Sequence, residues 1–194
     1  MAIAHIWLVD VDSTNAYAKR LLKEKQFPLL VRTPFLVRAE SQTMGRGRLG
    51  KPFFSPKGGL YMSLALKYGG SEEQTTLAAA VAVCRMLERY CGIRPHIKGV
   101  NDLLVDGKKV CGILCEAVCG QDGNIDTVIV GVGVNTQGEG YIFPDELKGI
   151  AGTVRSSLDN RRLAYKIARE IIKTVTWGTE YFLPAYEARL LKPL

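Results

Sequence analysis

A glycine-rich and strongly basic segment, residues 41–63 with the sequence SQTMGRGRLGKPFFSPKGGLYMS, is the part of this chain best suited to bind an anion. Its two arginines, Arg46 and Arg48, present planar forks that match carboxylate and phosphate groups. Between Glu40 and Glu72 the chain carries five basic residues and no acid, against a net charge of +7 for the whole chain. We therefore expect an anionic ligand here. The GRGR pattern alone leaves a solvated loop or a nucleic-acid contact open.

Two further segments could contribute to such a site. In IKGVNDLLVDG, Lys98 lies three residues before Asn101, so that an ammonium and an amide can lie on the same side of a strand end. A surface lysine followed by a turn-forming Asn-Asp pair is the alternative. In VGVGVNT, Gly131 and Gly133 interrupt a β-branched strand, and glycine weakens a strand unless something approaches its backbone closely. We expect a ligand or another strand at these glycines.

Other kinds of catalytic site find little support in the sequence. The chain has two histidines, His5 and His96, and it contains no Walker loop and no HExxH or GxSxG sequence. Its five cysteines form no CxxC pair, so we expect reduced thiols packed as small hydrophobic residues. Three of them, Cys111, Cys115 and Cys119, would share one face of a strand.

The spacing of apolar residues predicts an α+β fold. Strands are expected over residues 5–11, 34–42, 58–68 and 127–136, with one more strand before and one after a turn at Asp106-Gly107. Helices are expected over residues 16–24, 72–91, 160–177 and 181–191, the first three capped by Ser13 or Thr14, by Ser71 and by Asp159. Runs of strands beside separate helices indicate a mixed, mostly antiparallel sheet flanked by helices.

The length and hydropathy of the chain predict one domain over residues 1–194, because a chain of 194 residues usually builds a single core. Its longest apolar run, LAAAVAVC over residues 77–84, is far shorter than the roughly 20 residues of a membrane-spanning helix. The N-terminal sequence MAIAHIWLVD lacks the basic start and long apolar core of a signal peptide. We expect a cytoplasmic protein that contacts no membrane.

Six segments occur in an order that resembles the biotin protein ligases, and they are DSTN, ESQTMGRGRLG, FFSPKGGLYMSLAL, KGVNDLLVDGKKVCGILCE, VGVGVN and FPDEL. The resemblance implies a sheet flanked by helices, related to the class II aminoacyl-tRNA synthetases. It also implies an activity. These ligases use ATP with Mg²⁺ to convert biotin to biotinyl-5'-AMP and pyrophosphate. They then transfer the biotinyl group to a lysine of a biotin carboxyl carrier protein, part of a biotin-dependent carboxylase or decarboxylase.

The resemblance implies a role for each matched residue. Lys98 would be the main catalytic cation between the carboxylate and the α-phosphate, with Arg46 at the biotin carboxylate and Arg48 at the phosphates. Asn135 would contact adenine. The other implied binding residues are Ser13, Thr14 and Gln42 at the biotin head group, Asn15 beside them, Gly45 at the biotin end, Gly112 and Gly131 where backbone faces the ligands, and Asn101 and Asp102 around the lysine. No protein ligand to a metal is implied.

Three features depart from the family pattern. Gly99 and Val100 replace a usual tryptophan and proline, which leaves open a ligase for lipoate or octanoate, or a non-catalytic relative that binds biotin or its adenylate. Phe53 stands where tryptophan is common and keeps an aromatic surface. The chain ends at ARLLKPL, where many members continue into a small β-barrel, and no helix-turn-helix precedes HIWLVD. We expect no nucleic-acid partner, whereas a homodimer stays open.

Overall fold

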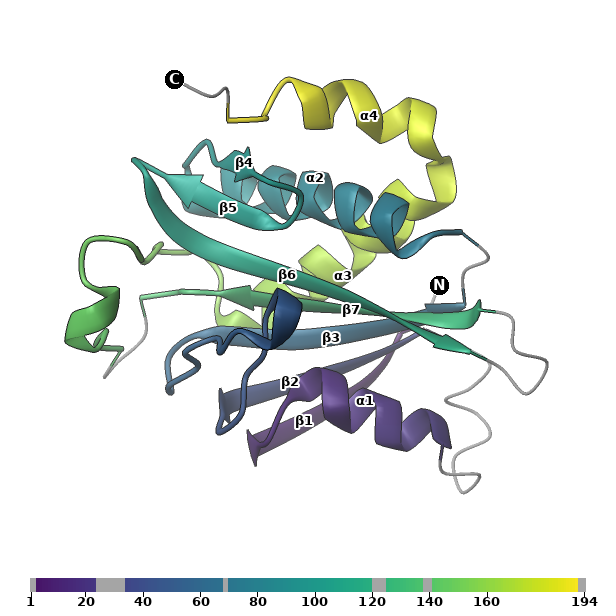
Figure 1. Ribbon diagram of the computed structural model, residues 1–194, viewed down its shortest axis with the longest axis horizontal. Helices are drawn as coiled ribbons and strands as arrows, with labels where there is room; N and C mark the ends of the chain where they lie inside the picture. Colours follow the sequence, from purple (N-terminus) through teal and green to yellow (C-terminus); the bar gives the residue numbers. More distant parts are fainter. Residues whose placement is uncertain (1–2, 24–33, 68–69, 120–124, 138–140, 192–194) are drawn as a thin grey trace.

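The computed structural model of the chain describes residues 3–23, 34–67, 70–119, 125–137 and 141–191. Seven strands form one sheet in the order β1-β2-β3-β7-β6-β5-β4 (Figure 1). Strands β1 and β2 are parallel, and the other neighbouring pairs are antiparallel. The mixed, mostly antiparallel sheet expected from the sequence is therefore confirmed. The strand bounds are β1 (Ala4–Val11), β2 (Phe35–Gln42), β3 (Leu60–Lys67), β4 (His96–Lys98), β5 (Asp102–Val105), β6 (Lys108–Cys119) and β7 (Ile125–Val134).

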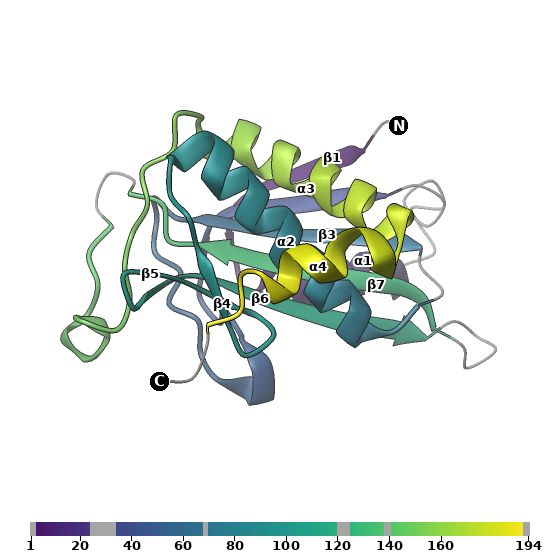
Figure 2. The ribbon, with the colours of Figure 1, turned by 90° about the horizontal axis from the view of Figure 1, so that it is seen from above.

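The two faces of the sheet carry different layers, because successive side chains of a strand point to opposite faces. On one face, α2 (Glu72–Cys91), α3 (Asn160–Trp177) and α4 (Thr179–Glu187) cover a large apolar core that includes Leu64 and Val130. On the other, α1 (Thr14–Lys23) covers a smaller cluster that includes Ala65 and Ile129. In Figure 1, α1 and the loop carrying the 3-10 turn η1 (Arg48–Gly50) lie in front of the sheet. Figure 2 shows α2 and α3 on its other side.

The predicted ends of α2 and α3 are confirmed by their caps. The Ser71 hydroxyl accepts a hydrogen bond from the Gln74 backbone at 3.1 Å, and Gly92 ends α2 in the left-handed conformation with φ 66°. The Asp159 carboxylate accepts from the Arg162 backbone at 2.8 Å. Capping satisfies backbone donors that a helix start leaves without partners. These caps are local, which is why the sequence predicted them.

The C-terminal helix differs from the expectation over residues 181–191. It begins at Thr179 and ends at Glu187. The chain beyond it extends beside β4, where the Ile97 backbone donates to the Arg189 carbonyl at 2.8 Å and the Leu191 backbone donates to the Ile97 carbonyl at 2.9 Å. The last residues therefore exchange helical hydrogen bonds for bonds to a sheet edge, a tertiary effect that helix propensity does not report.

The segment before the Asp106-Gly107 turn also differs from the expectation, because it forms two strands instead of one. The predicted turn itself is confirmed, with positive φ at Asp106 (50°) and Gly107 (75°), as a two-residue hairpin turn requires. A second reversal occurs at Gly99, whose φ is 62°, and it folds β4 back onto β5. This extra hairpin pairs Lys98 directly with Asp102.

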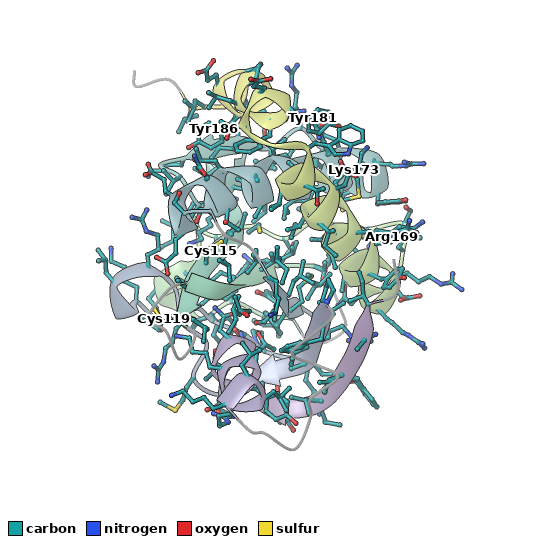
Figure 3. All side chains as sticks on the ribbon, turned by 90° about the vertical axis from the view of Figure 1, so that its right-hand side faces the viewer. Cys115, Cys119, Arg169, Lys173, Tyr181 and Tyr186 are labelled. Carbon is teal, nitrogen blue, oxygen red and sulfur yellow. The ribbon has the colours of Figure 1, made fainter. Side chains whose placement is uncertain are left out.

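The five cysteines are free thiols, as predicted, but they do not share one environment. Cys84 and Cys111 are fully buried, and burial raises the pKa of the Cys84 thiol to about 12. Cys115 packs against the same core, and burial raises its pKa to about 12. Cys119 is exposed at the end of β6, where the register with β7 shifts (Figure 3), so the prediction of one buried face is wrong there. No described helix is long and apolar enough to cross a membrane.

This difference predicts selective alkylation. Iodoacetamide at pH 8 should modify Cys119 in the native protein, and Cys84, Cys111 and Cys115 only after unfolding in guanidinium, because a buried thiol is neither accessible nor ionised. Peptide mass spectrometry of native and unfolded samples measures this. Native labelling of Cys84 or Cys111 at the rate of Cys119 would contradict the described core.

Candidate active site

A cavity of about 300 Å³ opens on the face of the sheet that α1 partly covers. Its walls come from the turn before α1, from the basic loop between β2 and β3, and from strands β5, β6 and β7. The two arms of the loop are joined at its base, since the Gln42 backbone at the end of β2 donates to the Ser55 carbonyl at 3.0 Å and the Phe53 backbone donates to the Gly45 carbonyl at 2.9 Å. The basic segment is therefore the outer wall of a cavity.

A row of paired residues crosses the floor of this cavity. Lys98 pairs with Asp102, Asp102 with Gly112, Gly112 with Gly133, and Gly133 with Tyr61. Residues paired directly across strands point to the same face, and neighbouring strands lie about 4.8 Å apart. Lys98 therefore stands on the cavity face, two strand spacings or about 10 Å from Gly112.

One end of the cavity is polar and buried. The Gln42 side-chain oxygen accepts hydrogen bonds from the Thr14 backbone at 2.9 Å and from the Thr14 hydroxyl at 3.1 Å. The Gln42 amide nitrogen donates to the Ser55 hydroxyl at 2.9 Å, and the Ser63 hydroxyl lies 2.8 Å from that of Thr14. The exposed fractions of Thr14 and Ser63 are 4% and 0%. A ligand that enters this end meets a preorganised hydrogen-bonding surface.

The turn that supplies this end is held by an ion pair. Both Arg20 amino groups donate to the Asp12 carboxylate at 2.8 Å, and these bonds hold the pKa of Asp12 at about 2. The Ser13 backbone also donates to the Asp12 carboxylate, at 2.8 Å. Ser13 precedes α1, and its hydroxyl accepts from the Ala16 backbone at 3.5 Å. Ser13, rather than Thr14, is therefore the cap of this helix.

Side chains of the protein cover the glycines of the floor. A Cβ atom at Gly131 would lie 2.4 Å from the Asn15 oxygen, and one at Gly133 would lie 2.4 Å from the Phe53 ring. A Cβ at Gly112 would lie 2.9 Å from the same ring. Something does approach this backbone closely, but in this structure it is neither the ligand nor the other strand that we expected. The partners in this structure are an amide and an aromatic ring.

The other end of the cavity is cationic. Of the residues lining it, Arg46, Arg48, Lys51 and Lys109 are basic and Asp102 alone is acidic. The Lys109 ammonium lies 2.7 Å from the Asp102 carboxylate and 5.7 Å from the centre of the Phe53 ring. The remaining cations favour an anion in the space between the loop and the sheet.

The turn between β4 and β5 is linked to this cationic end. The Arg48 guanidinium donates to the Asn101 side-chain oxygen at 3.5 Å. The Asn101 amide nitrogen donates in turn to the Ile113 carbonyl at 3.1 Å and to Asp102 at 3.2 Å. Asn101 therefore joins the basic loop, the turn and β6 at one point.

The cavity brings together most of the residues that the sequence singled out. Ten of them line it: Ser13, Thr14, Asn15, Gln42, Arg46, Arg48, Asn101, Asp102, Gly112 and Gly131. Gly45, Lys98 and Asn135 do not. Gly45 is buried at the loop base, where a Cβ atom would lie 2.5 Å from the Phe53 carbonyl. Lys98 is exposed, on the same face of the sheet as the cavity.

Asn135 lies beneath the cavity wall and not in it. Its amide nitrogen donates to the carbonyls of Lys109 and Gly152, both at 3.1 Å, and its oxygen accepts from the Tyr141 hydroxyl at 2.9 Å. With an exposed fraction of 4%, Asn135 braces the segment after β7 against β6. Contact with adenine stays a prediction for this residue.

Sequence reasoning missed Lys51, Lys109 and Ser63. Lys109 lines the cavity, and Ser63 contacts Thr14 and Asn15 without lining it. Both lie on strands, and the alternation of strand side chains gives no sign that a position faces a site instead of the core. The one usable signal was at Lys109, a charged residue three positions before Gly112 in a segment already singled out.

Solved structures place this fold in a known class. The biotin protein ligase from Aquifex aeolicus in complex with biotin and ATP has a TM-score of 0.78 at 29% identity, over 97% of this chain and 78% of that chain. The ligase from Leishmania major in complex with biotinyl-5-AMP has a TM-score of 0.77 at 22% identity, over 100% of this chain and 85% of that one. The fold is that of the biotin protein ligases, an α+β fold of the class II aminoacyl-tRNA synthetase kind, as the resemblance implied.

The chain belongs to the Biotin/lipoate A/B protein ligase family, whose sequence model matches residues 9–135. The bifunctional ligase/repressor BirA of Bacillus spizizenii is 44% identical over 120 residues, which are 60% of this chain and 37% of that protein. The biotin--[acetyl-CoA-carboxylase] ligase of Paracoccus denitrificans is 37% identical over 136 residues, which are 68% of this chain and 54% of that protein. The match thus spans about a third to a half of each relative's length.

The packing of Asn15 on Gly131 predicts a large effect from one added methyl group. Gly131→Ala should lower the free energy of unfolding by about 1–3 kcal/mol, because the new Cβ overlaps a side chain that is itself hydrogen-bonded and buried. Gly47→Ala is the matched control, since a Cβ at Gly47 would lie 3.5 Å from the Lys51 carbonyl, an ordinary contact. Urea denaturation measures both, and equal values for the two variants would contradict this packing.

Proposed function

We propose that this protein is an ATP-dependent biotin ligase. The observation that carries the proposal is the division of one cavity into a buried polar end at Thr14 and Gln42 and a cationic end at Arg46 and Arg48. Biotin has a polar ureido head and a carboxylate tail, and ATP adds three phosphates beside that tail. A cavity polar at one end and cationic at the other matches this distribution of charge.

The proposed reaction has two steps. A biotin carboxylate oxygen attacks the α-phosphorus of ATP, the bond to the β-phosphate oxygen breaks, and pyrophosphate leaves. A lysine amine of a carrier protein then attacks the acyl carbon of biotinyl-5'-AMP. It loses a proton, forms an amide and releases AMP. The first step brings two anions together, so charge neutralisation and positioning should supply most of the rate.

The cations around the cavity suit this first step. Arg46 and Arg48 lie on the loop wall of the cavity. Lys98 is outside its lining but pairs with Asp102, which pairs in turn with Gly112 on the floor. We assign the carboxylate to Arg46, the phosphates to Arg48, and the bridging position between them to Lys98. Lys51 also lines the cavity and adds positive charge, whereas the charge of Lys109 is paired with that of Asp102.

The loop has the properties of a wall that changes shape around its ligand. Leu49, at its tip, is 93% exposed and has a φ of 56°, a conformation that costs a residue other than glycine about 1–2 kcal/mol. We infer that closure of the loop would bury this leucine over the adenylate. Exclusion of water would protect the mixed anhydride from hydrolysis.

The polar end favours biotin over lipoate or octanoate. The heads of those two acids are a disulfide ring and a methyl group, which offer no N–H donor and no strong acceptor, so they gain no hydrogen bond from the polar surface at Thr14 and Gln42. Gly99 and Val100 stand where the family usually has tryptophan and proline. A ligase for lipoate or octanoate is therefore the second candidate. Gly99 itself is fixed, since its carbonyl accepts from the Tyr186 hydroxyl at 2.9 Å.

Magnesium fits this cavity only as an ion brought by ATP. No group of three or more His, Cys, Asp or Glu residues that could hold a metal occurs among the described residues. Asp102 offers one carboxylate at the cationic end, and Mg²⁺ is commonly held by one or two carboxylates together with substrate phosphates. When bound, the ion would neutralise charge on the leaving pyrophosphate.

The proposal extends to the partners and setting of the protein. The acceptor would be a biotin carboxyl carrier protein, with no nucleic acid or membrane involved, and residues 1–194 would form one catalytic domain. The free thiols fit a reducing cytoplasm. A homodimer could form along the β1 edge of the sheet, because an edge strand offers unpaired backbone groups.

The proposed function predicts ATP–pyrophosphate exchange that depends on biotin. Purified protein with Mg²⁺ and labelled pyrophosphate should give exchange with biotin and little with lipoate or octanoate. Lys98→Ala should lower the rate at least about 100-fold, the usual effect of removing one group that stabilises developing charge. Lys166→Ala, an exposed lysine of α3 on the opposite face of the sheet, is the matched control and should leave the rate unchanged.

Three outcomes would change the assignment. Exchange with lipoate or octanoate instead of biotin would establish the second candidate. Biotin binding without exchange would indicate a binding protein. A full rate in Lys98→Ala would remove this lysine from the mechanism.

A further inference from the structure

Glu116 on β6 lies outside the cavity and contacts Asn15, a residue that lines its polar end. One of its oxygens accepts a hydrogen bond from the Asn15 amide nitrogen at 2.8 Å, and the other accepts from the Lys19 ammonium at 2.5 Å. Asn15 and Lys19 are four residues apart, on the same side of α1. Glu116 therefore joins α1 to β6 through two charge-assisted bonds, the stronger class of hydrogen bond.

These contacts fix the orientation of the Asn15 amide. An ionised carboxylate only accepts hydrogen bonds, so the nitrogen of Asn15 must face Glu116. The same nitrogen also donates to the Leu114 carbonyl at 3.3 Å. The oxygen of Asn15 then faces the other way, 2.5 Å from the Ser63 hydroxyl. Both amide hydrogens are used within the protein, whereas the oxygen keeps a second lone pair.

Asn15 thereby presents an acceptor, and not a donor, to the cavity that it lines. It cannot move aside easily, because it is 6% exposed and lies directly on Gly131. A ligand group beside it must donate a hydrogen bond. The ureido head of biotin carries two N–H donors, whereas the heads of lipoate and octanoate carry none.

We propose that Glu116 is a positioning residue for specificity. It holds the Asn15 amide so that this end of the cavity selects an acid whose head group donates an N–H bond. The inference rests on the proposed function and extends it to a residue that does not touch the substrate.

Substitution of Glu116 by glutamine should reverse the amide. Lys19 only donates, so it will take the oxygen of the new side chain, and the nitrogen of that side chain will face Asn15. Asn15 must then turn its oxygen toward residue 116 and its nitrogen toward the cavity, where it opposes an N–H donor. We expect Glu116→Gln to raise the KM for biotin in pyrophosphate exchange about tenfold, with kcat within about twofold, as expected for one misdirected hydrogen bond.

A second substitution should restore binding. In Lys19→Met/Glu116→Gln, the side chain of residue 116 is free to turn its own oxygen toward Asn15, which returns the amide to its original orientation. The KM for biotin should fall back to within about threefold of the unsubstituted protein. A purely structural role for Glu116 predicts the opposite, because the double variant loses more contacts than the single one.

Glu170→Gln is the matched control. Glu170 also accepts from one basic side chain, with 3.4 Å between it and Arg85, but it lies on α3, on the opposite face of the sheet. Its substitution should leave the KM for biotin unchanged. An equal rise in KM in this control, or a further rise in the double variant, would overturn the proposal.

A measurement without ligand separates this inference from the proposed function. In ¹⁵N-labelled protein without biotin, the Asn15 side-chain amide signal, assigned by its loss in Asn15→Asp, should exchange slowly with solvent. It should shift in Glu116→Gln and return toward its original position in the double variant. An unchanged signal in Glu116→Gln would overturn the positioning role. Failure of the unsubstituted protein to bind biotin, with the signals behaving as described, would overturn the proposed function alone.

Discussion

The arrangement of this site depends on the absence of side chains at three positions of two central strands. Gly112, Gly131 and Gly133 leave the backbone of β6 and β7 bare on one face, while neighbouring residues such as Val130 and Val132 fill the opposite face with core. A side chain at any of the three would overlap Asn15 or Phe53. The absence of these three side chains therefore lets Asn15 and Phe53 lie directly on the strand backbones, and the dense packing on the other face keeps the floor of the cavity rigid.

Charge is distributed around this floor so that neither folding nor binding requires buried, unpaired ions. The cations stand on the loop, at the rim and at the strand ends, where water can reach them, and the buried end uses neutral groups. Lys109 is paired with Asp102, and Asp12 with Arg20. Partly exposed cations that flank a concave, apolar floor can attract an anion strongly without the desolvation cost of full burial.

Several residues matter to the site without lining it. Asn135 joins β6 to the segment around Gly152, Gly45 lets the loop base close, and Glu116 joins α1 to β6. Sites of this kind depend on such supports, because a ligand group misplaced by a fraction of an ångström loses most of its hydrogen bonding. The family relationship covers residues 9–135, so Asn135 and Glu116 belong to the matched part.

The sequence by itself determined the elements whose signals are local. It predicted the caps at Ser71 and Asp159, the turn at Asp106-Gly107, the alternation of strand residues and the basic loop. Each of these signals depends on neighbours within a few positions. The ordered motifs also singled out ten residues that line one cavity in the structure.

Tertiary structure alone decided the rest. The reversal at Gly99, the end of α4 beside Ile97 and the exposure of Cys119 depend on contacts between segments distant in the chain. The same holds for Asn15 lying on Gly131, Phe53 lying on Gly133, and the contact of Glu116 with α1, 101 residues away in sequence. A pattern of residue types records which face a strand turns to the core. It does not record which distant side chain will occupy the other face, because only the folded chain brings the two together.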